Sequence, residues 1–359
     1  MKKLMKGNVA IAEAAIQAGC RGFFGYPITP QNELIEYMSA QLPKKADGIF
    51  IQSESEVAAI NMVFGAAAAG IRAMTSSSGP GLSLKQEGIS YLAGAELPAV
   101  IINVMRAGPG LGGIQPSQSD YFQATKGGGH GDYTLLVYAP ATVQEAADLT
   151  QKALDRADFY RTPALILLDA IIGQMMEPCE IKPCDTRSRY PKDWAVNGES
   201  VQEGGEKTQR SLIKSLFLDP LKLNEHNKKL QKKYHDIALN ETMYDAAGCK
   251  GADKIIVAYG TSARIADSAT KEALKKGIRV GVFRPITLSP FPFTQLKEAA
   301  AGSAAVIVVE MSAGQMLYDV KLALEGAVPI RFVGEMGGII PTVSQVVEAL
   351  METEVDKDG

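Results

Sequence analysis

Clustered cysteines are absent from this chain of 359 residues, whose four cysteines are Cys20, Cys179, Cys184 and Cys249. Only Cys179 and Cys184 lie close together, whereas zinc and iron–sulfur sites use several thiolates at short, repeated spacings. Four cysteines in a chain of this length also do not make a disulfide framework. The sequence therefore predicts reduced thiols, a cytoplasmic location, and no metal ion held by this chain.

Long apolar runs and a strong excess of one charge are also missing. The most apolar stretch, residues 57–69, is rich in alanine and too short to span a bilayer. The first residues lack the apolar core of a signal peptide. The net charge of −3 gives no electrostatic reason to expect nucleic acid or an anionic membrane as a partner. We therefore expect neither kind of partner.

Two nucleotide-binding signatures are absent from the glycine-rich loops. Residues 76–81 (Ser-Ser-Ser-Gly-Pro-Gly) lack the Gly-Lys-Ser/Thr ending of a Walker A loop. Residues 108–113 lack the glycine phasing of a dinucleotide fingerprint, which disfavours a nicotinamide-dependent dehydrogenase. Loops of such small residues allow backbone to approach a ligand or a partner chain, and an ordinary tight turn is the alternative.

What the chain does contain is a repeated alternation of short apolar segments and helical patterns. Near-continuous apolar runs at 98–104 and 163–169 are typical of strands in a parallel sheet that is buried on both faces. Strand–helix alternation of this kind predicts doubly wound α/β domains. We expect a first domain over residues 1–180, an extended and helical connector over 181–252, and a second α/β domain over 253–359.

Several local features follow from the pattern of caps and apolar faces. Asn8 is placed to cap a helix over 8–19, and Thr29 to cap a helix over 31–41. The small and apolar helix over 57–70 is expected to be buried all round. The charged helix of the connector has a narrow apolar stripe that should pack on a neighbour, and its lysine-rich face is expected to be solvated.

Candidate site residues follow the predicted strands at their carboxyl ends, where open parallel sheets bind ligands. Thr29 follows the first strand, Glu54 and Glu56 follow the second, and Arg106 follows the strand at 98–104. The fork of an arginine side chain suits a carboxylate or a phosphate. Each residue also has a structural alternative: Thr29 as a helix cap, the glutamates as favourable charges at a helix N-terminus, and Arg106 as the partner of a structural acid.

Seven short motifs occur in order along the chain: Tyr26-Pro-Ile-Thr-Pro30, Glu54-x-Glu56, Ser78-Gly-Pro-Gly81, Gly94-Ala-Glu-Leu-Pro98, Arg106-Ala-Gly-Pro-Gly110, Arg284-Pro-Ile-Thr-Leu288 and Glu310-Met-Ser-Ala-Gly-Gln315. Together they resemble the alpha subunits of the 2-oxoacid:ferredoxin oxidoreductases. The similarity covers essentially the whole chain and is greatest to the branched-chain (2-oxoisovalerate) type. It implies two doubly wound α/β domains, a thiamine-diphosphate pyrimidine-binding domain and a transketolase C-terminal-like domain.

The resemblance also implies roles for individual residues. Glu56, preferred to Glu54 by counting back from the glycines of the following helix, matches the glutamate that contacts the aminopyrimidine ring and takes part in general acid–base work. Thr29 matches the threonine near the reacting carbon of the substrate, and Arg106 the arginine that receives the substrate carboxylate. The other cofactor-binding positions implied are Tyr26, Pro27, Ser78 and Gly79.

By the same resemblance, the activity is the oxidative decarboxylation of a branched-chain 2-oxoacid to acyl-CoA and CO2 with reduction of ferredoxin. The diphosphate signature Gly-Asp-Gly is absent, and Gly131-Asp132-Tyr133 is the nearest approach to it. Thiamine diphosphate would therefore be shared with a diphosphate-binding beta subunit, coenzyme A would be the co-substrate, and partner subunits would carry Mg2+ and the iron–sulfur clusters. A gamma subunit, a small ferredoxin-like subunit and ferredoxin complete the expected partners. The alternatives are a 2-oxoglutarate enzyme, which needs a further cation, and a non-catalytic scaffold.

Overall fold

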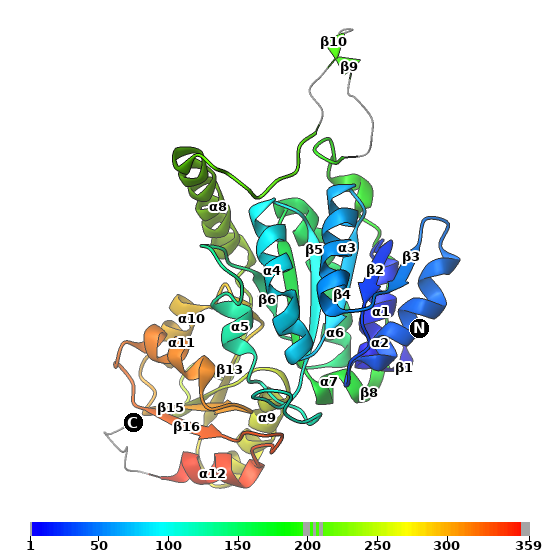
Figure 1. Ribbon diagram of the computed structural model, residues 1–359. Helices are drawn as coiled ribbons and strands as arrows, with labels where there is room; N and C mark the ends of the chain where they lie inside the picture. Colours follow the sequence, from blue (N-terminus) through cyan, green and yellow to red (C-terminus); the bar gives the residue numbers. More distant parts are fainter. Residues whose placement is uncertain (1, 197–201, 204–205, 208–210, 353–359) are drawn as a thin grey trace.

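Two mainly parallel β-sheets organise the chain, as Figure 1 shows. The computed structural model describes residues 2–196, 202–203, 206–207 and 211–352, with the backbone alone for the two short segments between 197 and 210. The second sheet and its helices, coloured yellow to red, lie below the first in this view. Of the helices described, none is long and apolar enough to cross a membrane.

The first sheet has seven strands in the order β14-β6-β7-β5-β4-β2-β3. Every pair is parallel except β14 with β6. Strands β5 and β7 are buried along their whole length, which explains the unbroken apolar runs in their sequences. The bounds are β2 (Gly22–Gly25), β3 (Ile49–Gln52), β4 (Ala73–Ser77), β5 (Ala99–Met105), β6 (Leu136–Tyr138), β7 (Pro163–Asp169) and β14 (Thr287–Ser289).

Helices cover both faces of the first sheet. Helices α3 and α4 pack on each other in front of the sheet in Figure 1, and α1 packs on α6, which lies behind it. A short antiparallel pair joins β1 (Lys3–Lys6) to β8 (Met176–Cys179). The helices are α1 (Gly7–Gln17), α2 (Asn32–Gln41), the 3-10 turn η1 (Leu42–Lys44), α3 (Glu56–Ala68), α4 (Pro80–Gly94), α5 (Tyr121–Thr125), α6 (Val143–Tyr160) and α7 (Ala170–Gln174).

The second sheet has five strands in the order β11-β13-β12-β15-β16, of which only β11 runs antiparallel. Helix α9 packs on α12, and α10 packs on α11. The elements are β11 (Tyr244–Ala247), β12 (Lys254–Val257), α9 (Gly260–Lys275), β13 (Val280–Pro285), α10 (Phe293–Ala300), β15 (Ala305–Glu310), α11 (Gln315–Leu324), β16 (Ile330–Gly334) and α12 (Val343–Met351).

Each sheet contains one strand from outside the residue range that was expected for its domain. Strand β14 follows β13 in the sequence but pairs with β6 of the first sheet, where Thr287 lies opposite Tyr138. Strand β11, inside the expected connector, pairs with β13 of the second sheet. The domain limits at 180 and 252 remain a prediction, and the chain crosses between the two sheets on both sides of residue 252.

The connector packs on the first unit, as its apolar stripe predicts. Helix α8 (Pro220–Glu241) buries Leu230, Tyr234 and Ile237 in the main core. Its lysine-rich face is for the most part solvated, as expected: Lys222, Lys228, Lys229 and Lys232 are exposed, and Lys233 is partly buried. Glu96, which has a φ of +53° just after α4, accepts hydrogen bonds from both Lys229 and Lys233. These ion pairs hold the pKa of the Glu96 carboxyl at about 2, although its burial acts in the opposite direction.

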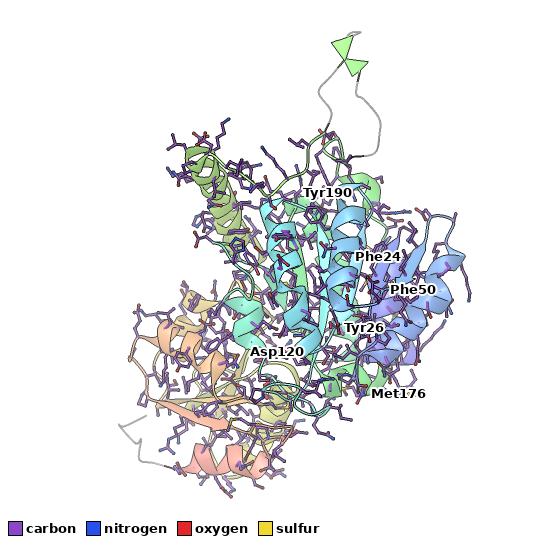
Figure 2. All side chains as sticks on the ribbon, in the orientation of Figure 1. Phe24, Tyr26, Phe50, Asp120, Met176 and Tyr190 are labelled. Atoms are coloured by element: carbon purple, nitrogen blue, oxygen red, sulfur yellow. The ribbon has the colours of Figure 1, made fainter. Side chains whose placement is uncertain are left out.

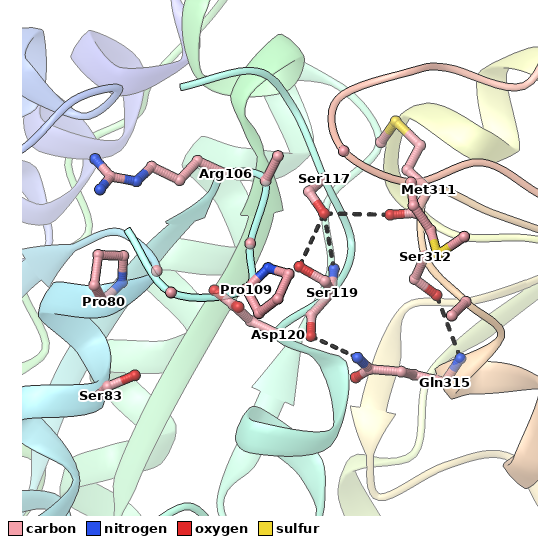
Figure 3. A pocket seen from close by; sticks show the side chains of 17 residues that line it. Pro80, Ser83, Arg106, Pro109, Ser117, Ser119, Asp120, Met311, Ser312 and Gln315 are labelled. Carbon is pink, nitrogen blue, oxygen red and sulfur yellow. Dashed lines mark hydrogen bonds between the residues drawn. The ribbon is translucent and has the colours of Figure 1, made fainter. Parts of the chain in front are cut away.

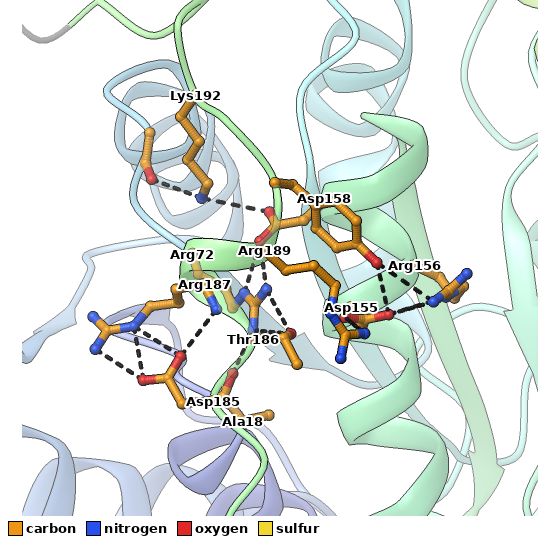
Figure 4. Close-up of polar contacts among 12 residues, drawn as sticks. Ala18, Arg72, Asp155, Arg156, Asp158, Asp185, Thr186, Arg187, Arg189 and Lys192 are labelled. Carbon is orange, nitrogen blue, oxygen red and sulfur yellow. Dashed lines mark hydrogen bonds and ion pairs between the residues drawn. The ribbon is translucent and has the colours of Figure 1, made fainter.

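Buried ion pairs anchor the start of the connector, around the 3-10 turn η2 (Arg187–Arg189), to the first unit (Figure 4). Arg72 donates to the carboxylate of Asp158 at 2.6 Å and to the hydroxyl of Thr186 at 3.2 Å. Lys192 reaches the same carboxylate at 3.5 Å and the backbone carbonyl of Gly70 at 2.8 Å. Because Arg72 and Asp158 are buried, removing one partner would leave an uncompensated charge in the protein interior. The remaining hairpin of the connector is β9 (Gln202–Glu203) with β10 (Glu206–Lys207).

Three local expectations were wrong, each for a tertiary reason. Asn8 lies inside α1 and caps nothing; its amide donates to the carbonyl of Pro30 and to Glu33, both at 2.9 Å. Helix α2 begins at Asn32 with Gln31 at its N-cap, so Thr29 does not cap it. Helix α3 is buried on one face only, and Val57 is 43% exposed, because the helix lies at the surface of the chain.

Candidate active site

The expected site residues gather at the carboxyl ends of the strands in the first sheet. Tyr26 follows β2 and Asp120 follows the loop after β5, and Figure 2 shows both at the end of this sheet that faces the second unit. Tyr26 and Pro27 are exposed. Gln31, which is buried, holds the turn that contains them in place. Its side-chain amide donates to the carbonyl of Tyr26 and accepts a hydrogen bond from the hydroxyl of Ser76.

Arg106 and Thr29 lie in direct contact. The guanidinium Nη1 donates to the backbone carbonyl of Thr29 at 3.0 Å, and Nη2 donates to the carbonyl of Leu111 at 3.2 Å. Both hydrogen bonds go to carbonyls, so the described contacts do not pair Arg106 with a structural acid. The side chain is 8% exposed, and its Nε has no partner among the described residues. A buried donor without an acceptor is costly, which leaves Nε available to a ligand.

Glu56 opens helix α3 and is 7% exposed, whereas Glu54 is exposed. Ser55 provides the N-cap by accepting from the backbone N–H of Ala58 at 3.1 Å. Gly81 of α4 lies directly against the carboxylate: a β-carbon added there would be 2.6 Å from Oε1 of Glu56. The local sequence therefore fixes where α3 begins, and the glycine makes room for an acidic side chain that has turned inward.

The carboxyl end of β4 and the loop that follows it present polar atoms without partners. Among the described residues, the hydroxyls of Thr75, Ser77 and Ser78 are buried and make no hydrogen bond. Gly79 follows with a φ of +41°, and a β-carbon there would lie 3.4 Å from Cγ of Arg106. The structure thus brings Ser78, Gly79, Arg106 and Thr29 to one corner, with Glu56 behind it across Gly81.

A cavity of about 770 Å³ lies between the two units, next to this corner (Figure 3). Its lining has one cation, Arg106, and one acid, Asp120. Burial raises the pKa of Asp120, while the hydrogen bond from Asn103 and the charge of Arg106 act in the opposite direction. Of the seven expected site residues, Arg106 and Gly79 line the cavity. The second unit closes it with Met311, Ser312, Ala313, Gln315, Met336 and Gly337.

Sequence reasoning missed the polar contacts that hold this cavity in shape. Gln118 donates to the carbonyl of Tyr259 and accepts from the hydroxyl of Ser262 and the backbone N–H of Met311. Gln315 donates to the carbonyl of Ser119 at 2.6 Å. Gln315 stands in one of the quoted motifs, but neither spacing nor burial in the sequence indicates that it binds a loop almost 200 positions away. The polar run 117–120 was the one local signal.

The fold and this cavity define an α/β protein of two mainly parallel-sheet units with a cavity at the strand ends between them. Residues 13–245 match the family model for pyruvate flavodoxin/ferredoxin oxidoreductase, thiamine diphosphate-binding, and residues 252–346 match core domain II of pyruvate:ferredoxin oxidoreductase. The chain belongs to this family and is a subunit of a 2-oxoacid:ferredoxin oxidoreductase. The expected family and the two kinds of domain are thereby confirmed.

Curated relatives span almost the whole chain. Ketoisovalerate oxidoreductase subunit VorB of Methanothermobacter thermautotrophicus is 49% identical over 99% of this chain and 98% of its own length. The 2-oxoglutarate synthase subunit KorA of Methanothermobacter marburgensis is 37% identical over 97% of this chain and 98% of its own length. The chain is thus similar to subunits named for two different 2-oxoacids, with the higher identity to VorB.

Two solved structures share the fold. The 2-oxoglutarate:ferredoxin oxidoreductase from Magnetococcus marinus, solved with 2-oxoglutarate, coenzyme A and succinyl-CoA bound, matches 97% of this chain with a TM-score of 0.84 and 25% identity. This chain spans 64% of that longer chain. A split-gene transketolase matches 96% of this chain and 95% of its own chain with a TM-score of 0.57 and 16% identity, which shows the fold alone.

Proposed function

We propose that this subunit binds the aminopyrimidine half of thiamine diphosphate and the carboxylate of a branched-chain 2-oxoacid. The complex would oxidise that acid to acyl-CoA and CO2 and pass two electrons to ferredoxin. One observation carries the substrate choice: Arg106 is the only cation in the described lining of the cavity. A dicarboxylate such as 2-oxoglutarate needs a second cation, because burying an unpaired carboxylate is costly. The name of the relatives that are 49% identical, ketoisovalerate oxidoreductase, supports the same choice.

The residues at the corner fit the aminopyrimidine half of the cofactor. Glu56 offers a buried carboxylate, Ser78 an unpartnered hydroxyl, and Gly79 and Gly81 an approach without side chains. In our proposal Glu56 hydrogen-bonds the pyrimidine ring nitrogen, and Ser78, Gly79, Tyr26 and Pro27 surround the ring. Thiamine diphosphate, when bound, supplies the electron sink for decarboxylation.

The chain's own residues would then bind the substrate, orient it and hold a proton. The free Nε of Arg106, together with the adjacent Nη, forms a fork for the substrate carboxylate, and charge-assisted bonds of this kind are strong. The contact between Arg106 and the carbonyl of Thr29 fixes both groups, so that Thr29 can face the reacting carbon. Glu56, shielded from water, holds a proton at the ring nitrogen and so acts in general acid–base catalysis.

The complex would also contain partner subunits and cofactors that this chain does not bind alone. A beta subunit would bind the diphosphate with Mg2+, and a gamma subunit and a small ferredoxin-like subunit, which carries iron–sulfur clusters, would complete the complex. In the described residues no group of three or more His, Cys, Asp or Glu side chains is placed to hold a metal ion. Coenzyme A is proposed as co-substrate on the strength of the Magnetococcus marinus enzyme. The cytoplasmic location stays a prediction.

The test is an anaerobic assay of the complex co-purified with this chain. Coenzyme A, thiamine diphosphate and a viologen dye would be supplied with 2-oxoisovalerate, 2-oxoglutarate or pyruvate. We expect dye reduction to be fastest with 2-oxoisovalerate and to fall by about two orders of magnitude or more in Glu56→Gln. Preference for 2-oxoglutarate would overturn the substrate assignment. Undiminished turnover in an assembled Glu56→Ala complex would overturn the role of Glu56.

A further inference from the structure

Residues 211–218 of the connector form neither a helix nor a strand, and they lead into the start of α8 (Figure 1). Among the described residues, none of their backbone N–H or C=O groups hydrogen-bonds another backbone group. Backbone groups in a folded protein are almost always paired, either with other protein groups or with water. The backbone of this segment is therefore open to a partner.

The side chains of the segment alternate between two environments. Ile213 packs against the main core, and Phe217 stacks on His226 of α8 with ring centroids 4.8 Å apart. Ser215, between them, lies beside Gly94 at the end of α4. The even-numbered residues are exposed: Leu212, Lys214, Leu216 and Leu218. Because a period of two is that of a β-strand, the segment lies on the chain as a strand does and presents one row of side chains outward.

That outward row is mainly apolar. Leu212, Leu216 and Leu218 are 74%, 69% and 89% exposed, and Leu221 in the first turn of α8 is 72% exposed. Single exposed apolar residues are ordinary on a protein surface, whereas a contiguous group of them marks an interaction site. Four leucines within ten residues make such a group, which we name the leucine strip together with the backbone of 211–218.

Positive charge surrounds the leucine strip. Residues 211–233 hold six lysines and two acidic residues, although the whole chain has a net charge of −3. In the described part of the chain, only Lys229 and Lys233 of this group form ion pairs, both with Glu96. A partner surface that carries carboxylates would complement the other lysines. A second copy of this chain, related by a twofold axis, would instead bring two surfaces of like charge together.

We propose that the leucine strip docks a partner subunit whose facing surface is apolar at its centre and acidic at its rim. The partner adds an edge strand to the unpaired backbone of 211–218, its apolar groove takes the leucines, and its carboxylates face Lys214 and Lys222. Main-chain hydrogen bonds and pockets for alternate side chains are the usual elements of such strand addition. The inference rests on the proposed function only in that this chain works in a complex with other subunits.

The first test is applied to the intact complex purified through this chain. A carbodiimide joins a lysine amine to a carboxylate in contact with it, forming an amide bond while the reagent takes up the water released. We expect Lys214 or Lys222 to be joined to an Asp or Glu of a partner subunit, as identified by peptide mass spectrometry. Crosslinks to acidic residues of this chain alone, in the same or a second copy, would overturn the inference, and so would no crosslink at either lysine.

Hydrogen–deuterium exchange of the same complex tests the strand addition. The amides of residues 212–218 have no backbone acceptor in the described chain, so only a partner can protect them in this way. We expect them to exchange at least about a hundredfold more slowly than in a synthetic peptide of the same residues. Exchange at the rate of the peptide would overturn the proposal.

The double variant Leu216→Ser with Leu218→Ser tests the apolar contact. We expect the complex to dissociate at a protein concentration about tenfold higher than for the wild type, measured by mass photometry on dilution. The matched control is Leu4→Ser with Leu274→Ser, in which leucines that are 63% and 64% exposed lie in β1 and α9, and it should leave dissociation unchanged. Unchanged dissociation in the Leu216 and Leu218 variant would overturn the inference. A wild-type complex that docks through the strip but reduces no dye with any 2-oxoacid would overturn the proposed function alone.

Discussion

Arg106 donates a hydrogen bond of 3.0 Å to the backbone carbonyl of Thr29, although the two residues are 77 positions apart. This contact joins the ends of β5 and β2 and leaves Nε of the guanidinium without a partner. An arginine that is held at one edge and free at the other is prepared to bind an anion without rearranging. Four predictions follow from this site and from the helices that surround it.

Replacing Arg106 by lysine should weaken substrate binding and leave the fold intact. Lysine keeps the charge but lacks the planar fork, so it cannot bind Thr29 and a carboxylate together. We expect the KM for the 2-oxoacid to rise by about tenfold to a hundredfold in Arg106→Lys, measured by dye reduction. The matched control is Arg264→Lys, whose guanidinium pairs with Glu177 of β8 and does not line the cavity. An unchanged KM in Arg106→Lys would contradict a role in carboxylate binding.

Adding a methyl group at Gly81 should displace the carboxylate of Glu56. The added carbon would lie 2.6 Å from Oε1 of Glu56 and 2.4 Å from Oγ of Ser77. In Gly81→Ala, the affinity for thiamine diphosphate in calorimetry should fall by about tenfold or more. Gly65→Ala in α3 is the control, because nothing lies within 4 Å of the added carbon. It should leave the affinity unchanged and stabilise the helix by up to about 1 kcal/mol.

The ion pairs of Glu96 with α8 should make stability depend on pH. The pKa of Glu96 is about 2 in the folded chain and 4.5 for the free side chain. Because the folded-state pKa is lowered, this contribution is complete above about pH 4.5 and is lost as the pH falls to about 2. Glu96→Gln should therefore lower the free energy of unfolding by on the order of 2 kcal/mol at pH 7 and by little near pH 2.

Urea denaturation of this variant at several pH values would measure the effect of Glu96. Glu298→Gln, on the exposed side of α10, is the matched control and should change little at any pH. A loss in Glu96→Gln that is equally large at pH 2 and pH 7 would show that the pairing with Lys229 and Lys233 is not its source.

A second cation in the cavity should change the substrate preference. Met336 lines the cavity and is largely exposed, so Met336→Lys can be accommodated without disturbing the core. We expect the ratio of kcat/KM for 2-oxoglutarate to that for 2-oxoisovalerate to rise by about tenfold. Met336→Leu keeps the apolar wall and should leave the ratio unchanged. Should Met336→Lys also leave it unchanged, the charge of the lining would not be what selects the substrate.

Much of the fold and of the candidate site was accessible from the sequence. The apolar runs of β5 and β7 predict buried parallel strands, and residues 163–169 were placed with the bounds that the structure has. Thr29, Glu56 and Arg106 were singled out because each follows a predicted strand, and the seven motifs gave the family. The resemblance also favoured Glu56 over Glu54. Which glutamate is buried depends on where α3 begins and on which residue packs against its first turn. That residue is Gly81 of α4, which lies against the carboxylate of Glu56.

The sequence by itself determined the class of fold, the family and the strand ends at which the candidate site residues lie, because apolar periodicity and short motifs are local properties of the chain. Only the tertiary structure decided which polar groups meet: Asn8 with Pro30, and Glu96 with Lys229 and Lys233. It also decided that β14 pairs with β6 of the first sheet. It also placed the ammonium group of Lys85, which no motif in the sequence singles out, against the backbone carbonyl of Glu56. The physical reason is that burial and pairing depend on how α3 and α4 approach each other, and residues far apart in the sequence set that distance.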